Sequence, residues 1–111
     1  MDRQHFQAYM TDILQKALLK FSTKNKGYGQ ADDVWHNFRS SAKRVWGDSE
    51  WDTMFQVLMT YVDKHLVALC NGGIGEKEYQ ERWDDIIVYA LLAKGMRKER
   101  DFELMGGIKH E

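Results

Sequence analysis

Apolar side chains recur every three or four residues along most of the chain, which is the spacing of amphipathic α-helices. This spacing predicts helices over residues 3–24, 31–46, 49–70 and 76–98. Proline is absent from the sequence. No stretch sustains the two-residue alternation of a half-buried strand. The pattern therefore predicts an all-α protein.

Short polar connections separate the predicted helices. Gly27 and Gly29 are expected to end the first helix, and the run NGGIG at 71–75 is expected to end the third. Asp48 or Ser49 is expected to cap the start of the third helix, because both side chains can accept backbone N–H groups. Short connections between long helices favour antiparallel neighbours. We therefore expect a small antiparallel bundle of about four helices.

All 111 residues are predicted to form this one domain, with a loosely ordered tail over 99–111. The fourth helix has an unusual pattern. Its core face is expected to centre on Tyr79, Trp83, Ile86 and Ala90, yet the opposite side also turns apolar after Asp85. A helix that is apolar all round is buried on both sides. The pattern therefore predicts either a larger bundle or completion of the bundle by oligomerisation.

Charge and cysteine content narrow the class of protein. The 16 basic and 17 acidic residues leave a net charge of −1, so we expect no nucleic-acid partner and no membrane partner. The longest apolar run, at 86–93, is too short to span a bilayer, and the first residues are polar and acidic rather than signal-like. The single Cys70 suits a reducing compartment and is expected to be buried. A soluble, cytoplasmic protein is predicted.

Acidic residues on the last two helices suggest a magnesium site. Glu81 and Asp85 lie four residues apart on one helix stripe, with Asp84 nearby, and Asp63 borders the apolar stripe of the preceding helix. If the two helices are antiparallel, these carboxylates can supply the oxygen ligands that Mg²⁺ prefers. The alternative is structural. The acids on the fourth helix then form a solvated first half, and Asp63 pairs with Lys64 or a nearby arginine.

The joint between the first two helices, KNKGYGQADDVWHNF at 24–38, is unusually rich in basic, aromatic and amide side chains. It lacks the glycine spacing and terminal Lys-Ser/Thr of a P-loop, so the segment alone is weak evidence for phosphate binding. The alternative is a simple turn in which Asp32 or Asp33 caps the second helix. The spacing does not decide between a binding segment and a turn.

Four segments in order resemble the small phage and bacterial MazG-like proteins, in particular the subgroup called nucleotide-modification-associated domain 1. The segments are KNKGYG, then NF, then YVDKHLVAL and finally ERWDDIIVYALLA. The resemblance spans most of residues 10–95. The matching positions are Lys24, Tyr28, Gly29, Asn37, Phe38, Arg39, Asp63, Lys64, Glu81, Asp85, Tyr89, Ala90, Leu91 and Leu92.

The resemblance implies an all-helical hydrolase, usually a homodimer or homotetramer, that cleaves nucleoside triphosphates to a monophosphate and pyrophosphate. It implies Mg²⁺, with Mn²⁺ as the alternative, as the cofactor and a nucleotide as the ligand. The implied metal ligands are Asp63, Glu81, Asp84 and Asp85, and the implied catalytic residues are Glu81, Asp85 and Lys64. The implied substrate-binding residues are Lys24, Lys26, Tyr28, Asn37 and Phe38.

The chain departs from the family pattern at the acids. Thr60 and Leu66 flank Asp63 where a typical member carries a second glutamate, so the E-x-x-E pair is missing. On the last helix the strict E-x-x-D spacing selects Asp84, whereas the distance to the downstream tyrosine selects Asp85. Nucleotide binding without hydrolysis is therefore also open. The alternative function is a small helical phage-type interaction protein that inhibits a host defence complex without catalysis.

Overall fold

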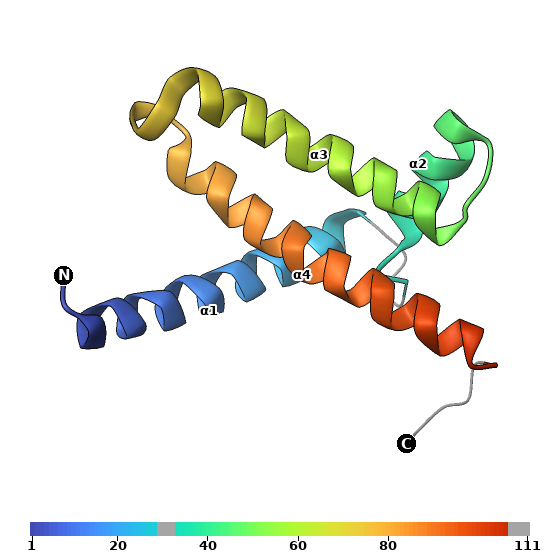
Figure 1. Cartoon of the computed structure of the whole chain (residues 1–111), viewed down its shortest axis with the longest axis horizontal. Coiled ribbons are helices and arrows are strands. Elements are labelled where there is room, and N and C mark those ends of the chain that lie inside the picture. Colours follow the sequence, from blue (N-terminus) through green and yellow to red (C-terminus); the bar gives the residue numbers. More distant parts are fainter. Residues whose placement is uncertain (29–32, 107–111) are drawn as a thin grey trace.

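Four α-helices and one 3₁₀ turn make up the part of the chain that the structure describes (Figure 1). The helices are α1 (Arg3–Tyr28), α2 (His36–Trp46), α3 (Trp51–Gly72) and α4 (Tyr79–Leu104), and the 3₁₀ turn η1 (Gly73–Gly75) precedes α4. This computed structural model describes the backbone of residues 1–28 and 33–106 and the side chains of residues 1–21 and 33–106. No strand occurs in these ranges, which confirms the predicted all-α fold.

The helices are arranged around α3 and α4, which form an antiparallel hairpin closed by η1 (Figure 1). α2 packs against α3 at the end far from the hairpin turn, and α1 packs mainly against α4. The main core lies where α2, α3 and α4 meet. Its buried members are Phe38, Ala42, Met54, Val57, Leu58 and Met96. None of the described helices is long and apolar enough to cross a membrane.

The helix boundaries differ from the predicted ones near the joint. α1 does not stop before Gly27 but continues to Tyr28, because a single glycine weakens a helix without breaking it. α2 begins at His36 rather than at residue 31. Asp33 precedes the capping position, and its side chain accepts the N–H of Trp35 at 3.0 Å. It therefore stabilises a turn, whereas Asp32 and Gly29 lie outside the described residues.

A second polar turn precedes α3. The helix begins at Trp51, and Glu50 occupies the capping position without a side-chain hydrogen bond. Asp48 instead accepts the N–H of Glu50 at 3.0 Å and the hydroxyl of Thr53 at 2.6 Å. Asp48 thus stabilises the entry to the helix from two residues upstream. Gly47, which ends α2, has a φ of 94°, a conformation that favours glycine.

The predicted core face of α4 was wrong. Ala90 is exposed and Trp83 is 38% exposed, whereas Tyr89, Leu92 and Ala93 pack against the main core. The sequence pattern did not decide between the two sides, because α4 carries apolar residues on both beyond Asp85. The side of α4 opposite the predicted core face was expected to contact a larger bundle or a second subunit. It is covered by α2 and α3 of the same chain. α4 also runs to Leu104, so residues 99–104 are helical and not a loose tail.

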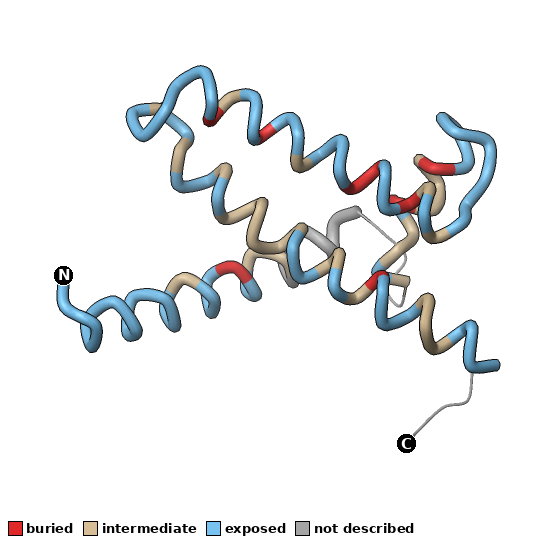
Figure 2. The backbone as a smooth tube through the Cα atoms, viewed as in Figure 1, coloured by how far each residue is buried: buried red, intermediate tan, exposed pale blue. Residues whose placement is uncertain are grey.

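The apolar stripe of α1 is largely uncovered. Ala17 is buried, but Phe6, Met10, Leu14 and Leu18 are between 42 and 57% exposed. Figure 2 shows the same contrast, with buried positions gathered on α2 and α3 and most of α1 exposed. The apolar spacing that predicted this helix therefore does not correspond to a buried face in the single chain.

Cys70 lies near the end of α3. It is exposed, which corrects the expectation that it is buried.

Candidate functional site

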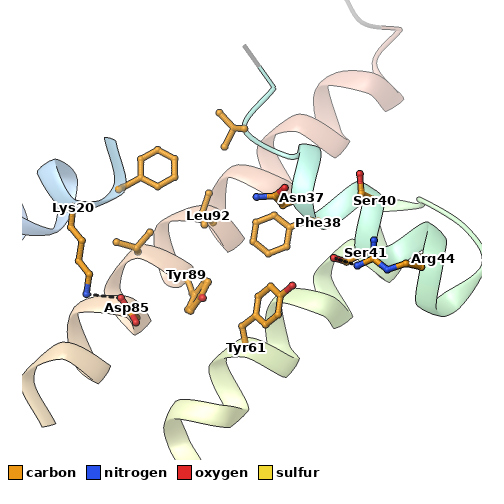
Figure 3. A pocket seen from close by; sticks show the side chains of 13 residues that line it. Lys20, Asn37, Phe38, Ser40, Ser41, Arg44, Tyr61, Asp85, Tyr89 and Leu92 are labelled. Carbon is orange, nitrogen blue, oxygen red and sulfur yellow. Dashed lines mark hydrogen bonds and ion pairs between the residues drawn. The ribbon is translucent and has the colours of Figure 1, made fainter. Parts of the chain in front are cut away.

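A cavity of about 410 Å³ lies where all four helices approach one another (Figure 3). This volume falls within the range of about 300–1,000 Å³ that is typical of small-molecule sites. Its polar lining residues are Lys20, Asn37, Ser40, Ser41, Arg44 and Asp85. Its apolar and aromatic lining residues are Phe21, Val34, Phe38, Tyr61, Val88, Tyr89 and Leu92. The cavity therefore combines a few polar groups with a mostly apolar wall, as ligand sites usually do.

Aromatic rings from three helices form one side of the cavity. The ring centroids of Phe38 and Tyr61 are 6.0 Å apart, and those of Tyr61 and Tyr89 are also 6.0 Å apart. Both pairs are tilted, by 50° and 35° respectively. Tilted rings at this distance attract one another and stay fixed by packing. The result is a rigid aromatic wall, to which α2, α3 and α4 each contribute one ring.

One end of the cavity holds an ion pair between α1 and α4. Nζ of Lys20 lies 2.7 Å from Oδ1 of Asp85, and both face the cavity in Figure 3. The two side chains are 29% and 22% exposed, so solvent screens this pair less than it screens an ordinary surface pair. Asp85 also lies close to His65 on α3, whose Nε2 is 3.4 Å from Oδ2. Asp85 on α4 thus contacts polar side chains from both α1 and α3.

His65 extends this network away from the cavity. It is 9% exposed, and its Nδ1 lies 3.2 Å from Nη1 of Arg82. Because an arginine only donates hydrogen bonds, Nδ1 must accept, and the proton of the neutral ring then lies on Nε2, facing Asp85. The Nε atom of Arg82 is 3.4 Å from a carboxylate oxygen of Glu76. The network therefore runs from Lys20 through Asp85, His65 and Arg82 to Glu76.

Burial favours the neutral form of His65. Removal of the ring from water lowers its pKa below the ordinary value. The carboxylate of Asp85 acts in the opposite direction, whereas Arg82, Lys64 and Lys20 lower the pKa further. A neutral His65 can donate from Nε2 to Asp85 and accept from Arg82 at the same time. The Nε2–H group of this ring therefore faces the Asp85 carboxylate at 3.4 Å.

The opposite end of the cavity is formed by α2. Ser40, Ser41 and Arg44 all line the cavity, and Nη2 of Arg44 lies 3.5 Å from the hydroxyl oxygen of Ser41. Asn37, one turn earlier on the helix, adds an amide to the same wall. Figure 3 shows Ser40, Ser41 and Arg44 on the far side of the aromatic rings from Lys20 and Asp85, and Asn37 beside the Phe38 ring. The cavity therefore has two polar ends with an aromatic region between them.

The predicted metal ligands are not gathered into one group. Asp63 and Glu81 are exposed, and Asp85 alone of the predicted acids lines the large cavity. Asp84 lines a separate groove between α1 and α4. Among the described side chains, those of residues 1–21 and 33–106, no three from His, Cys, Asp or Glu lie close enough to hold a metal ion. Lys64, the remaining predicted catalytic residue, is exposed on α3.

The positions of these acids fit a magnesium site completed by the ligand better than a site made only of protein carboxylates. A cage made only of protein ligands does not form from Asp63, Glu81 and Asp85 of one chain. Mg²⁺ usually takes one or two carboxylates and completes its shell with water and substrate phosphates. Asp85 is such a carboxylate, because it is partly buried and faces the cavity. The residues therefore fit a magnesium ion that enters together with a phosphate-bearing ligand.

The structure describes the side chains of two predicted substrate-binding residues, Asn37 and Phe38, but not those of the other three. Asn37 and Phe38 both line the cavity, as a substrate-binding role requires. Phe38 is also 7% exposed and belongs to the main core, so it supports the fold as well. Lys24, Lys26 and Tyr28 lie in the last two turns of α1, and their side chains lie outside the described residues.

Several residues of the cavity and its network escaped the sequence analysis. Lys20, Arg44 and Arg82 have no local signature, because their roles depend on partners from other helices. His65 had a usable signal. It lies seven residues after Leu58 and four before Leu69, both buried, so it occupies a core position of α3. A polar ring at such a position needs polar partners, and this requirement points to a buried network.

Comparisons with protein families, with curated proteins and with solved structures found no match to this chain.

Proposed function

We propose that the cavity binds a nucleotide and that the protein is a magnesium-dependent pyrophosphohydrolase of nucleoside triphosphates, or a relative that binds nucleotides without cleaving them. The observation that carries this proposal is the composition of the cavity. It joins an aromatic wall, an amide, two basic side chains and one partly buried carboxylate in a volume of about 410 Å³. The aromatic wall and the amide suit the base of a nucleotide, and the charged side chains suit its phosphates and their metal ion.

The base of the nucleotide is assigned to the aromatic wall. Phe38, Tyr61 and Tyr89 offer ring surface, and stacking on aromatic rings tolerates any base. Asn37 carries both a donor and an acceptor, so its amide is suited to the edge of a base. Arg44 supplies positive charge for phosphate oxygens. Lys20 pairs with Asp85 in the free protein, and it would become available to the phosphates when a metal ion binds Asp85.

Asp85 is the residue assigned to hold the metal, jointly with the phosphates of the ligand. Bound there, the ion would neutralise charge on the phosphates and lower the pKa of a coordinated water. His65 orients the Asp85 carboxylate, and the ammonium of Lys20 balances the negative charge of Asp85 when no metal ion is bound. The resemblance to MazG-like proteins also assigns Asp63, Glu81 and Lys64 to this chemistry, and they stay candidates for it.

Pyrophosphate release from a panel of ribo- and deoxyribonucleoside triphosphates tests the proposal. Each triphosphate is incubated with the protein in the presence of Mg²⁺, of Mn²⁺, or of EDTA. We expect pyrophosphate and a monophosphate from at least one triphosphate, and none with EDTA. If no triphosphate is cleaved, binding is measured by thermal shift, since a ligand that binds only the folded state raises the melting temperature. Absence of both cleavage and binding would refute the proposal.

An oligomer is part of the same proposal. A monomeric protein of 13.1 kDa exposes about 6,400 Å² on average, whereas this chain exposes 8559 Å². Its radius of gyration is 16.3 Å, against about 13 Å for a compact domain of this length. Each partner in a standard interface buries about 800 Å². The excess exposed area is therefore ample for a homodimer or a homotetramer.

The exposed stripe of α1 also favours the second candidate function, an interaction protein without catalysis. Tyr9, Met10 and Leu14 on α1 line a groove with Trp83 and Ile87 on α4. A groove of apolar and aromatic residues also suits a different protein partner. Size-exclusion chromatography and the nucleotide panel separate the two functions. A monomer that binds no nucleotide and forms a stable complex with a host protein would support the second.

A further inference from the structure

Arg44 differs from the other basic residue of the cavity in its partners. Lys20 is neutralised by Asp85 at 2.7 Å. The side chain of Arg44 contacts the hydroxyl of Ser41, and within the described residues no carboxylate lies within ion-pair distance of it. Asp85 is also the only acidic residue among the described residues that line the cavity. Among these residues, none compensates the positive charge at the α2 end of the cavity.

The neighbours of Arg44 suit an anion. Ser40 lies four residues before Arg44 and Ser41 lies three before it, so both hydroxyls lie on the same side of α2 as the guanidinium. Hydroxyl groups donate hydrogen bonds to phosphate oxygens, and a guanidinium offers two parallel N–H donors to them. The three side chains together present the donors that a phosphate needs, without an acid to repel it.

The helix itself does not attract an anion at this point. Arg44 lies in the last turn of α2, where the helix dipole is negative and favours a cation. Any anion held here is therefore held by the side chains. For this reason, substitution of the side chains is a direct test.

We infer that Arg44, Ser40 and Ser41 form an anion subsite that takes the phosphate of a nucleoside monophosphate without the help of a metal ion. This inference rests on the proposed function for the placement of a nucleotide in the cavity. In a metal-free monophosphate complex, the base then lies on the aromatic wall and the phosphate lies at the α2 end. The phosphates that would share a metal ion with Asp85 are those of a triphosphate bound with Mg²⁺, at the opposite end of the cavity.

The test compares the common deoxynucleosides with their 5′-monophosphates, and adds inorganic phosphate as a third probe. Affinities are measured by NMR titration in EDTA, so that no divalent cation contributes. We expect at least one monophosphate to bind wild-type protein about tenfold or more tightly than its nucleoside, as a charge-assisted contact provides. In Arg44→Gln this ratio falls to near one, while the affinity for the nucleoside is retained. Arg44→Lys retains part of the ratio.

Lys43→Gln is the matched control, because Lys43 is an exposed basic residue on the same turn and does not line the cavity. We expect it to leave the ratio unchanged. Melting temperatures of all variants verify that they are folded. An equal loss of affinity in Lys43→Gln, or no preference of the wild type for monophosphates, overturns the inference.

The outcomes separate this inference from the proposed function. If a nucleotide binds and Arg44→Gln has no effect, the subsite is refuted and the proposed function stands. If neither nucleosides nor monophosphates bind in EDTA, but inorganic phosphate binds wild type and not Arg44→Gln, the anion subsite stands without a nucleotide in it. If none of the three probes binds wild-type protein, the subsite is refuted. In both cases the triphosphate panel with Mg²⁺ decides the proposed function, which is refuted when that panel shows neither cleavage nor binding.

Discussion

Lys20 on α1 and Asp85 on α4 form an ion pair, with Nζ 2.7 Å from Oδ1, at the edge of the cavity. This pair ties α1, which packs mainly on α4, to the polar network that continues through His65 into α3. In this pair, the ammonium of Lys20 balances the negative charge of Asp85, which is the carboxylate that we propose as the metal ligand.

The Lys20–Asp85 pair is expected to contribute to stability. Lys20→Met removes the ammonium from a partly buried carboxylate, and we expect a loss of about 1 kcal/mol in the free energy of unfolding. Urea denaturation measures this loss. Lys16→Met is the matched control, since Lys16 forms an exposed pair with Asp12 at 2.9 Å one turn earlier on α1. We expect it to cost less than about 0.5 kcal/mol. Equal costs for the two variants would contradict this role of Lys20.

The response to magnesium should depend on Asp85. Asp85 faces the large cavity, whereas Asp84 lines the groove on the other side of α4. In the presence of a bound nucleotide, we expect Mg²⁺ to raise the melting temperature of wild type and of Asp84→Asn, but not of Asp85→Asn. Differential scanning fluorimetry measures the shift. If the response to Mg²⁺ is instead lost in Asp84→Asn alone, the metal ligand is Asp84, as the strict E-x-x-D spacing of the sequence predicts.

Stability should fall in mildly acidic solution because of His65. Burial lowers the pKa of this ring in the folded protein below its ordinary value of about 6.5. Between the two pKa values the unfolded chain binds a proton that the folded chain does not, so stability decreases as the pH falls from about 7.5 through 6.5. The loss levels off below the folded pKa. Urea denaturation between pH 5.5 and 8 measures the slope.

His65→Gln is the matching variant for this prediction. Glutamine retains a donor and an acceptor but does not titrate. We therefore expect the slope above pH 6 to become flatter by up to one proton per molecule. A slope that is unchanged in His65→Gln would assign the pH dependence to other groups.

The exposed stripe of α1 should hold the oligomer together. Leu14 is 48% exposed and lines the groove between α1 and α4. We expect wild-type protein to be a dimer or a tetramer at micromolar concentrations, and Leu14→Glu to be a monomer, because the substitution would bury a charge in the interface. Light scattering after size-exclusion chromatography measures the mass. Gln15→Glu adds the same charge at the neighbouring exposed position and should stay assembled. A monomeric wild type would exclude this interface.

The fold was more predictable from the sequence than the site. Helix periodicity predicted four helices because it depends on neighbours along the chain. It misplaced the core face of α4, since Trp83 and Tyr89 are both aromatic and packing alone decides which is covered. In the site, Asn37, Phe38 and Asp85 were predicted and all line the cavity. Lys20 and Arg44 were missed because their positions depend on how distant helices meet.

The cavity draws its lining from residues as far apart in the chain as Lys20 and Leu92. No fragment that omits a helix retains the whole wall, so the pocket exists only when folding of all four helices is complete. A ligand seated there would consequently stabilise the fold cooperatively from end to end. Protection from hydrogen exchange would then rise in α1 as well as in the hairpin, although α1 contributes only Lys20 and Phe21 to the described lining of the cavity.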